Sequence, residues 1–462
     1  MSSLRAVRTV LLVVALVHGA FYAVLMPPWQ APDEVAHFEY SHLLAALGRP
    51  ISAADDSIPL EQQIIRSLYQ FHAWTYRGNQ PPARVPERLS QTPFGYSRTL
   101  DRFSLTYVVY ALAVWPFLAQ DLVVQLYAMR VASIVMGALV VLLAFETASL
   151  VSPGQPALAL ATAGFVLFLP QQAYIAAAVS DGNLAELAAS ACIFLVAAMW
   201  RQGVRWPQVA ACFLGAVAAI LSKATAYFLV AFLLIVGPAL VFRWQPAGQA
   251  PRGWSWRRLA TGGLVVGGLG AVLIPVILLA PPLQYIRGML DSNLQHLTDF
   301  VPYLLSLNSA GHFANALWQT FNSFWATFGW MTFWFPSPVY LTLLGAVILV
   351  LGGLVWHVHR LPAAAEPRKS LLMLLSLAAM LELAVLVTWF VTSPNGVNYF
   401  QGRYLFTAIV PIAVLLAAGG LALVPERWQP RAALVGVVLM ILLDAAAMFT
   451  LAWPYFYRSG LA

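Results

Sequence analysis

Long apolar segments constrain the fold of this chain more than any other feature. Of its 462 residues, 61% are hydrophobic and 9% are charged, whereas soluble globular domains carry about 25% charged residues. A helix needs about 20 apolar residues to cross a bilayer. The chain is therefore predicted to be an all-α polytopic membrane protein, a single domain over 1–462. About eleven segments have a suitable length: 9–26, 122–149, 157–176, 183–200, 208–222, 225–242, 259–280, 337–356, 370–392, 404–423 and 432–452.

The first apolar segment, from Val10 to Met26, resembles a signal peptide but is long enough to span the bilayer. Arg5 and Arg8 precede it, and no small-residue cleavage pattern follows it. Because basic residues favour the cytoplasmic side, we expect a retained first span with a cytoplasmic N-terminus. The protein is then a multi-pass protein of the cytoplasmic membrane.

The cysteines and the net charge exclude two other classes of protein. Cys192 and Cys212 lie within apolar runs and lack the spacing of a zinc site, so we expect two small core side chains and no disulfide. The net charge of +7 comes largely from basic residues between membrane spans. Such a distribution follows membrane topology and does not indicate nucleic-acid binding.

Two stretches are too polar to be membrane spans, 27–121 and 281–336. The first is rich in aromatic residues, which distinguishes it from a disordered linker, so we expect interfacial helices there. Its segment from Phe103 to Ala119 could either cross the bilayer or lie along the interface. The interfacial arrangement places the Arg and Lys residues of the short loops mainly in the cytoplasm, and the positive-inside rule favours it. Both polar stretches are then extracytoplasmic loops.

A charged motif, Pro32-Asp33-Glu34-Val35-Ala36-His37-Phe38, follows the first span. A proline at the first helical position and acids in the first turn predict a helix that runs towards Leu47. On this helix Asp33 and His37 are one turn apart and share a face. The motif therefore places two carboxylates and an imidazole at the edge of the membrane.

The predicted topology brings three more charged residues to the same side: Asp181, Lys223 and Arg403. Each also has a structural interpretation. Asp181 could cap a helix, and Lys223 could extend its amine to the interface. Arg403 stands near a helix start, where a cation opposes the macrodipole, so a purely structural role is less favoured.

Acids and bases on one membrane face indicate a reaction with an anionic lipid substrate. A carboxylate near an acceptor hydroxyl can act as general base, and cations can hold a phosphate leaving group. This combination describes glycosyl transfer from a lipid phosphate.

The motif after the first span resembles the Pro-Asp-Glu-x-x-His-Phe signature of uncharacterised polytopic membrane proteins that are grouped with the GT-C glycosyltransferase superfamily. A second match is Gln401-Gly402-Arg403-Tyr404, and a weaker one is Val179-Ser180-Asp181. Arg130 also falls where these proteins often carry an arginine, and we expect it to pair with a neighbour or a lipid headgroup. The resemblance covers most of the chain in architecture, but only these short stretches are specific.

The resemblance implies a GT-C-like bundle and a polyprenyl-phosphate-linked sugar as donor. It gives Asp33 the role of general base, Glu34 that of a supporting or metal-binding acid, and Asp181 a place near the acceptor or a metal. Lys223 and Arg403 would hold the donor phosphate. His37, Gln401 and Tyr404 complete the expected substrate-binding set.

Two points of the resemblance stay open. Asp33, Glu34, His37 and Asp181 would make an oxygen-rich site for a divalent metal, but metal dependence varies within the superfamily. Many relatives begin the interfacial helix with Pro-Pro-Tyr-Tyr, whereas this chain reads Phe103-Ser104-Leu105-Thr106-Tyr107.

Two other functions, neither of which breaks a covalent bond, are also compatible with these charged residues. A transporter of lipid-linked saccharides would bind a phosphate with them, and a structural subunit of an envelope assembly would use the outer loops for docking. For the enzyme, the acceptor hydroxyl could belong to a lipid, a glycan or a protein.

Overall fold

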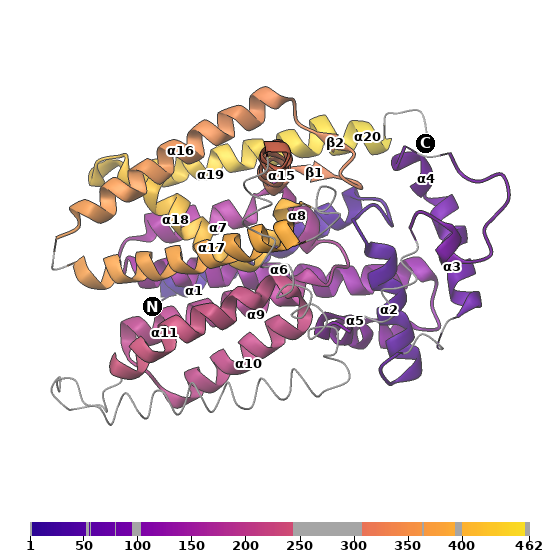
Figure 1. Ribbon diagram of the computed structural model, residues 1–462, viewed down its shortest axis with the longest axis horizontal. Coiled ribbons are helices and arrows are strands. Elements are labelled where there is room, and N and C mark those ends of the chain that lie inside the picture. Colours follow the sequence, from indigo (N-terminus) through magenta and orange to yellow (C-terminus); the bar gives the residue numbers. More distant parts are fainter. Residues whose placement is uncertain are drawn as a thin grey trace.

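The computed structural model describes residues 2–51, 55, 57–78, 80–94, 103–243, 307–362, 365–392 and 400–457. Within these ranges the regular secondary structure is helical apart from one two-stranded antiparallel ribbon, β1 (Thr327–Phe328) and β2 (Phe333–Trp334) (Figure 1). The all-α polytopic fold is thereby confirmed.

Eight helices of the described part are long and apolar enough to cross a membrane. They are α1 (Ser2–Leu25), α6 (Leu122–Val151), α9 (Gly182–Gln202), η4 (Ala224–Tyr227) with α11 (Phe228–Arg243), α16 (Ser337–Arg360), α17 (Glu366–Thr392), η8 (Gly402–Ala408) with α18 (Ile409–Ala422), and η9 (Glu426–Trp428) with α19 (Gln429–Ala446), η10 (Ala447–Ala452) and α20 (Trp453–Tyr457). A bent pair, α7 (Pro156–Leu167) with α8 (Pro170–Ala176), makes a ninth candidate. Of the remaining predicted spans, 208–222 is the shorter apolar helix α10 (Trp206–Ser222), and 259–280 lies outside the described residues.

The predicted span 157–176 is broken in the structure, because α7 and α8 meet at 62°. Helix α7 ends at Leu167, and the N–H of Phe168 donates to the carbonyl of Gly164. Proline has no N–H and disfavours a helical conformation in the residue before it. Leu169 accordingly adopts an extended conformation, and Pro170 begins α8.

The first polar stretch folds into short helices at the end of the bundle that lies away from the N-terminus (Figure 1). They are α2 (Glu34–Leu47), α3 (Ile58–Gln70), α4 (Ala73–Tyr76), η1 (Leu89–Gln91), α5 (Leu105–Val114) and η3 (Trp115–Phe117). At 1.5 Å per residue, α5 with η3 reaches only about 20 Å, too short for a bilayer core of about 30 Å. The segment after Phe103 therefore does not span by itself.

These short helices have a hydrophobic core of their own. It includes Trp29, Phe38, Ile64 and Tyr110, all fully buried, and it continues onto Met129 of α6. A second and larger core lies between the long helices. The short helices of the first polar stretch, which we call the outer helices, are thus anchored to the bundle through α6.

The described helices also include α15 (Leu307–Trp325). Helices α9 and α10 pack closely as an antiparallel pair. The sulfur atoms of Cys192 and Cys212 lie 3.2 Å apart, and both thiols are free and buried, which confirms the expected core cysteines. Cys192 lies about three turns after Asp181, and Cys212 about three turns before Lys223. The register that joins the two cysteines therefore also brings Asp181 to Lys223.

One buried acid in the outer helices predicts a pH-dependent stability. Burial raises the pKa of Glu39 to about 7, and the nearby Glu61 carboxylate adds to the effect, whereas Arg88 opposes it. Arg88 itself pairs with Glu61 at 2.9 Å. Because the pKa of Glu39 is higher in the folded than in the unfolded chain, its ionisation costs stability as pH rises from about 4.3 to 7.

Glu39→Gln is therefore expected to raise the free energy of unfolding at pH 8 by about 2–3 kcal/mol and to give no gain at pH 4. Thermal unfolding of the purified protein at both pH values measures the difference. Glu87→Gln, a change of an exposed carboxyl in the same loop, is the matched control and should have little effect at either pH. A Glu39→Gln variant less stable than the native chain at pH 8 would contradict the prediction.

Candidate functional site

The turn between α1 and α2 presents Asp33 in an unusual backbone conformation. Asp33 has φ 64° and ψ 6°, in the left-handed region that aspartate tolerates better than most residues. Helix α2 begins directly after it, at Glu34, and ends at Leu47 with Gly48 also left-handed. The predicted helix is confirmed, but Asp33 lies just before its first turn. Its side chain makes no capping hydrogen bond and is available to a distant partner.

That partner is Arg403. Its Nη2 lies 2.9 Å from Asp33 Oδ2, and its Nη1 donates to the carbonyl of Pro32 at 3.4 Å. The Arg403 side chain is 5% exposed and that of Asp33 is 32% exposed. The guanidinium therefore lies beneath the carboxylate, which keeps an accessible face.

Gly402 brings Arg403 to this position. A Cβ atom on Gly402 would lie 2.1 Å from the backbone nitrogen of Phe324 in α15. The N–H of Gly402 also donates to Ser323 Oγ at 2.7 Å. The chain can approach α15 this closely only with glycine at this position.

A second ion pair joins Asp181 and Lys223, with Nζ 2.7 Å from Oδ1. Asp181 stands at the start of α9 but makes no capping hydrogen bond, so the capping interpretation is wrong. Burial by itself would raise the pKa of Asp181, but the charges of Lys223, His37 and Arg403 lower that pKa to about 2. Asp181 is therefore a carboxylate at neutral pH.

His37 lies next to Asp181, with Nε2 3.9 Å from Oδ1. Its Nδ1 contacts the hydroxyl of Tyr107 at 3.0 Å. Burial lowers the pKa of His37, and the negative charges of Asp181 and Asp33 offset this only in part. The imidazole is thus neutral at pH 7.

Tyr404 connects the two ion pairs. Lys223 Nζ and Arg403 Cζ each lie 5.6 Å from the centre of its ring, within the range of a cation–π contact. Gln401 is half-buried, and its carbonyl accepts the N–H of Tyr404 at 3.0 Å. The predicted residues other than Glu34 therefore lie in or beside one cluster, which we call the charged cluster: Asp33, His37, Asp181, Lys223, Gln401, Arg403 and Tyr404.

Helix α5 holds the backbone of the charged cluster, a role that the sequence did not reveal. The hydroxyl of Ser104 donates to the carbonyl of Ser222 at 2.8 Å, and that of Thr106 donates to the carbonyl of Asp181 at 2.7 Å. Tyr110 donates to the carbonyl of Ser180 at 3.0 Å. These three hydroxyls, within seven residues of one another in the sequence, therefore fix the backbone beside Asp181 and Lys223.

Glu34, expected to be a supporting or metal-binding acid, lies outside the charged cluster. Its side chain is fully buried and pairs with Arg130 at 2.7 Å. The N–H groups of Trp29 and Val179 also donate to its oxygens. A carboxylate enclosed in this way holds the loop in position. Arg130 thus pairs with a protein neighbour and not with a lipid headgroup.

The remaining side chains do not fit a metal site of the expected kind. Across the part of the chain that the structure describes, no group of three or more His, Cys, Asp and Glu side chains could hold a metal ion. Glu34 is enclosed by Arg130, and Asp33 and Asp181 each already contact a cation. Asp33 and Asp181 therefore face cations of the protein itself and do not form the expected oxygen-rich metal site with Glu34.

The fold and the charged cluster define a polytopic membrane protein with paired acids and bases at one end of its helical bundle. The chain belongs to the family described as predicted membrane protein (DUF2142), whose family model matches residues 16–416. No curated protein matches the sequence.

Proposed function

We propose that the protein is a membrane glycosyltransferase of the GT-C type, which moves a sugar from a polyprenyl-phosphate donor to an acceptor hydroxyl. The observation that carries this proposal is the charged cluster itself. Four distant segments contribute Asp33, Asp181, Lys223 and Arg403 to it, and the two carboxylates are more exposed than the cations with which they pair. We place the reaction on the extracytoplasmic face of the cytoplasmic membrane, in the assembly of the cell envelope.

In the proposed reaction, the oxygen of the acceptor hydroxyl attacks the anomeric carbon of the sugar, and a carboxylate oxygen of Asp33 takes the proton of that hydroxyl. The bond from that carbon to the phosphate oxygen breaks, and polyprenyl phosphate leaves. Arg403 orients the carboxylate of Asp33 through one Nη atom. The Nε of Arg403 is buried and has no hydrogen-bond partner among the described residues. In the proposed reaction this Nε donates to a phosphate oxygen of the donor. Lys223 supplies the second cation, and Asp181 keeps that amine in place.

Asp33→Asn tests the role of the base. The amide cannot accept the acceptor proton, so the rate of sugar transfer is expected to fall about 10²–10⁴-fold while the fold is retained. Transfer is measured on purified protein with a polyprenyl-phosphate-linked sugar and an acceptor mixture from the same membranes. Asp55→Asn is the matched control, since Asp55 pairs with Arg49 in the same loop but outside the charged cluster. A folded Asp33→Asn variant with the native rate would rule out this assignment.

A transporter of lipid-linked saccharides is the second candidate, and the broken span α7–α8 favours it, because transporters often bind substrates at discontinuous helices. The same assay separates the two functions. A transporter moves the intact donor across vesicles and releases no polyprenyl phosphate, whereas the proposed transferase releases one for each sugar transferred.

A further inference from the structure

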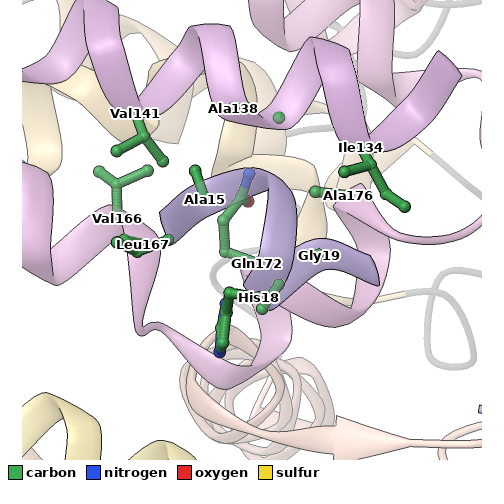
Figure 2. A pocket seen from close by; sticks show the side chains of 12 residues that line it. Ala15, His18, Gly19, Ile134, Ala138, Val141, Val166, Leu167, Gln172 and Ala176 are labelled. Atoms are coloured by element: carbon green, nitrogen blue, oxygen red, sulfur yellow. The ribbon is translucent and has the colours of Figure 1, made fainter. Parts of the chain in front are cut away.

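A cavity between α1, α6, α7 and α8 is too small for a ligand larger than water (Figure 2). Small and aliphatic side chains make up most of its wall, and it offers about 30 Å³ to the centres of water-sized molecules. One water needs about 10–15 Å³ by the same measure. A larger ligand of this part of the protein would therefore bind to the surface of the bundle.

A basic surface lies at the end of the bundle that also holds the N-terminus, where α16 ends, α17 begins and η9 leads into α19 (Figure 1). These helix ends lie close together. A Cβ on Gly353 of α16 would lie 2.8 Å from a methyl group of Leu423, three residues before η9. His357 of α16 is within electrostatic range of Arg368 in α17 and of Glu426 in η9. We call the five cations of these ends the basic patch: Arg360, Arg368, Lys369, Arg427 and Arg431.

The cations of the basic patch form no ion pair within the part of the chain that the structure describes. The ion pairs found there involve other cations, for example Arg8 and Arg403. Two acids lie in the same region, but Glu366 accepts a hydrogen bond from Ser370 and Glu426 is exposed. The patch therefore has an excess of positive charge, which attracts an anion.

Two exposed tryptophans accompany the basic patch. The guanidinium carbon of Arg360 lies 4.5 Å from the centre of the Trp356 ring, and that of Arg431 lies 4.6 Å from the centre of the Trp428 ring. Both distances are within the range of a cation–π contact. Because tryptophan is enriched where membrane and water meet, we expect the patch to lie at the level of the lipid headgroups.

Exposed apolar side chains adjoin the basic patch on the side of the membrane interior. Met373 is one turn after Lys369 in α17, and Leu434 is one turn after Arg431 in α19. Residues three or four apart lie on the same face of a helix. Each of these faces thus carries a cation at the helix end and an apolar surface next to it. This order matches a charged headgroup followed by acyl chains, whereas a free phosphate ion has no use for the apolar part.

We propose that the basic patch binds the headgroup of an anionic phospholipid. The phosphate lies among the cations, and the acyl chains lie against the exposed apolar side chains of α17 and α19. The topology predicted from the sequence places this end in the cytoplasm, and the cytoplasmic leaflet carries anionic lipids. The site lies at the opposite end of α18 from η8, so it is separate from the charged cluster and does not depend on the proposed transferase activity.

Native mass spectrometry of the full-length protein in detergent, titrated with phosphatidylglycerol or phosphatidylcholine, tests the proposal. We expect phosphatidylglycerol to bind about tenfold more tightly or better, since each cation near an anionic lipid contributes about fivefold in affinity. Arg368→Gln with Arg431→Gln should therefore weaken phosphatidylglycerol binding about twentyfold and leave phosphatidylcholine binding unchanged. Arg431 is exposed, so Arg431→Gln alone, with a loss of about fivefold, provides the test if the double variant does not fold.

Arg201→Gln with Arg205→Gln is the matched control. It removes two exposed cations at the end of α9 that lies away from Asp181, and it changes the net charge by the same amount. Phosphatidylglycerol binding should change little in this variant. Equal losses in the two double variants would indicate diffuse attraction, and equal binding of the two lipids would indicate that no anion site exists; either result overturns the proposal. Inorganic phosphate that displaces phosphatidylglycerol with the affinity of the lipid itself would contradict the contribution of the acyl chains and overturn the proposed lipid site.

Discussion

Glu34→Gln is expected to destabilise the protein by about 3–5 kcal/mol, because it removes one partner of a buried ion pair. Arg130 and Glu34 are 1% and 0% exposed, and Arg130 also donates to the carbonyls of Ala23 and Met26 at 2.8 Å each. Without the carboxylate, the guanidinium is a buried charge whose remaining acceptors are neutral. The expected result is a large loss of folded protein, measured as a fall in unfolding temperature and in yield from the membrane.

A double variant and a surface pair sharpen this test. Glu34→Gln with Arg130→Met removes both charges and should recover part of the lost stability, since the cost lies mainly in the unpaired charge. The pair of Arg8 and Glu146 lies at the surface, with side chains 46% and 21% exposed. Glu146→Gln should therefore cost less than about 1 kcal/mol. Equal losses from Glu146→Gln and Glu34→Gln would contradict the assigned role of burial.

Gly402→Ala is expected to displace Arg403 from Asp33 and, under the proposed function, to abolish sugar transfer. The new Cβ would lie 2.1 Å from the nitrogen and 2.2 Å from the Cα of Phe324, both backbone atoms of a packed helix that cannot move aside. The segment η8 must shift, and the hydrogen bond from Gly402 to Ser323 is lost with it. We expect a loss of several kcal/mol in stability, typical of overpacking combined with a broken buried hydrogen bond.

Gly420→Ala is the matched control for that substitution. Gly420 lies in the last turn of the neighbouring helix α18, and a Cβ there would meet only a methyl group of Val350 at 3.8 Å. Alanine within a helix is favoured over glycine by up to about 0.5–1 kcal/mol, so this variant should be as stable as the native chain or more so. A Gly402→Ala variant that unfolds at the native temperature would show that η8 does not need its contact with α15.

Much of the architecture follows from local properties of the sequence. Span lengths depend on runs of apolar residues, which the bilayer requires wherever a helix crosses it. The break before Pro170 could also have been predicted, because proline and the residue before it interrupt a helix for local steric reasons. Likewise, Arg130 within a predicted span indicated a partner, either a neighbouring side chain or a lipid headgroup, since a charge at that depth is rarely left alone.

The surroundings of Asp33 and Glu34 depended on the tertiary structure. The two acids are adjacent, at the start of the same helix, and no local property distinguishes the acid that stays partly exposed from the one that is enclosed. Their partners lie far away in the sequence: Arg130 reaches Glu34 from α6, and Arg403 reaches Asp33 from η8. Only the packing of these helices decides which carboxylate is enclosed and which is exposed.

The sequence by itself determined the class of protein, most of its membrane spans and the set of charged residues from which the site is built. Hydropathy and charge position are properties of short segments, and the membrane acts on each segment separately. The tertiary structure decided how these charges pair, that Glu34 is enclosed, and that hydroxyls of α5 hold the loops of Asp181 and Lys223. Pairing depends on distances between segments far apart in the chain, and only the packed bundle sets those distances.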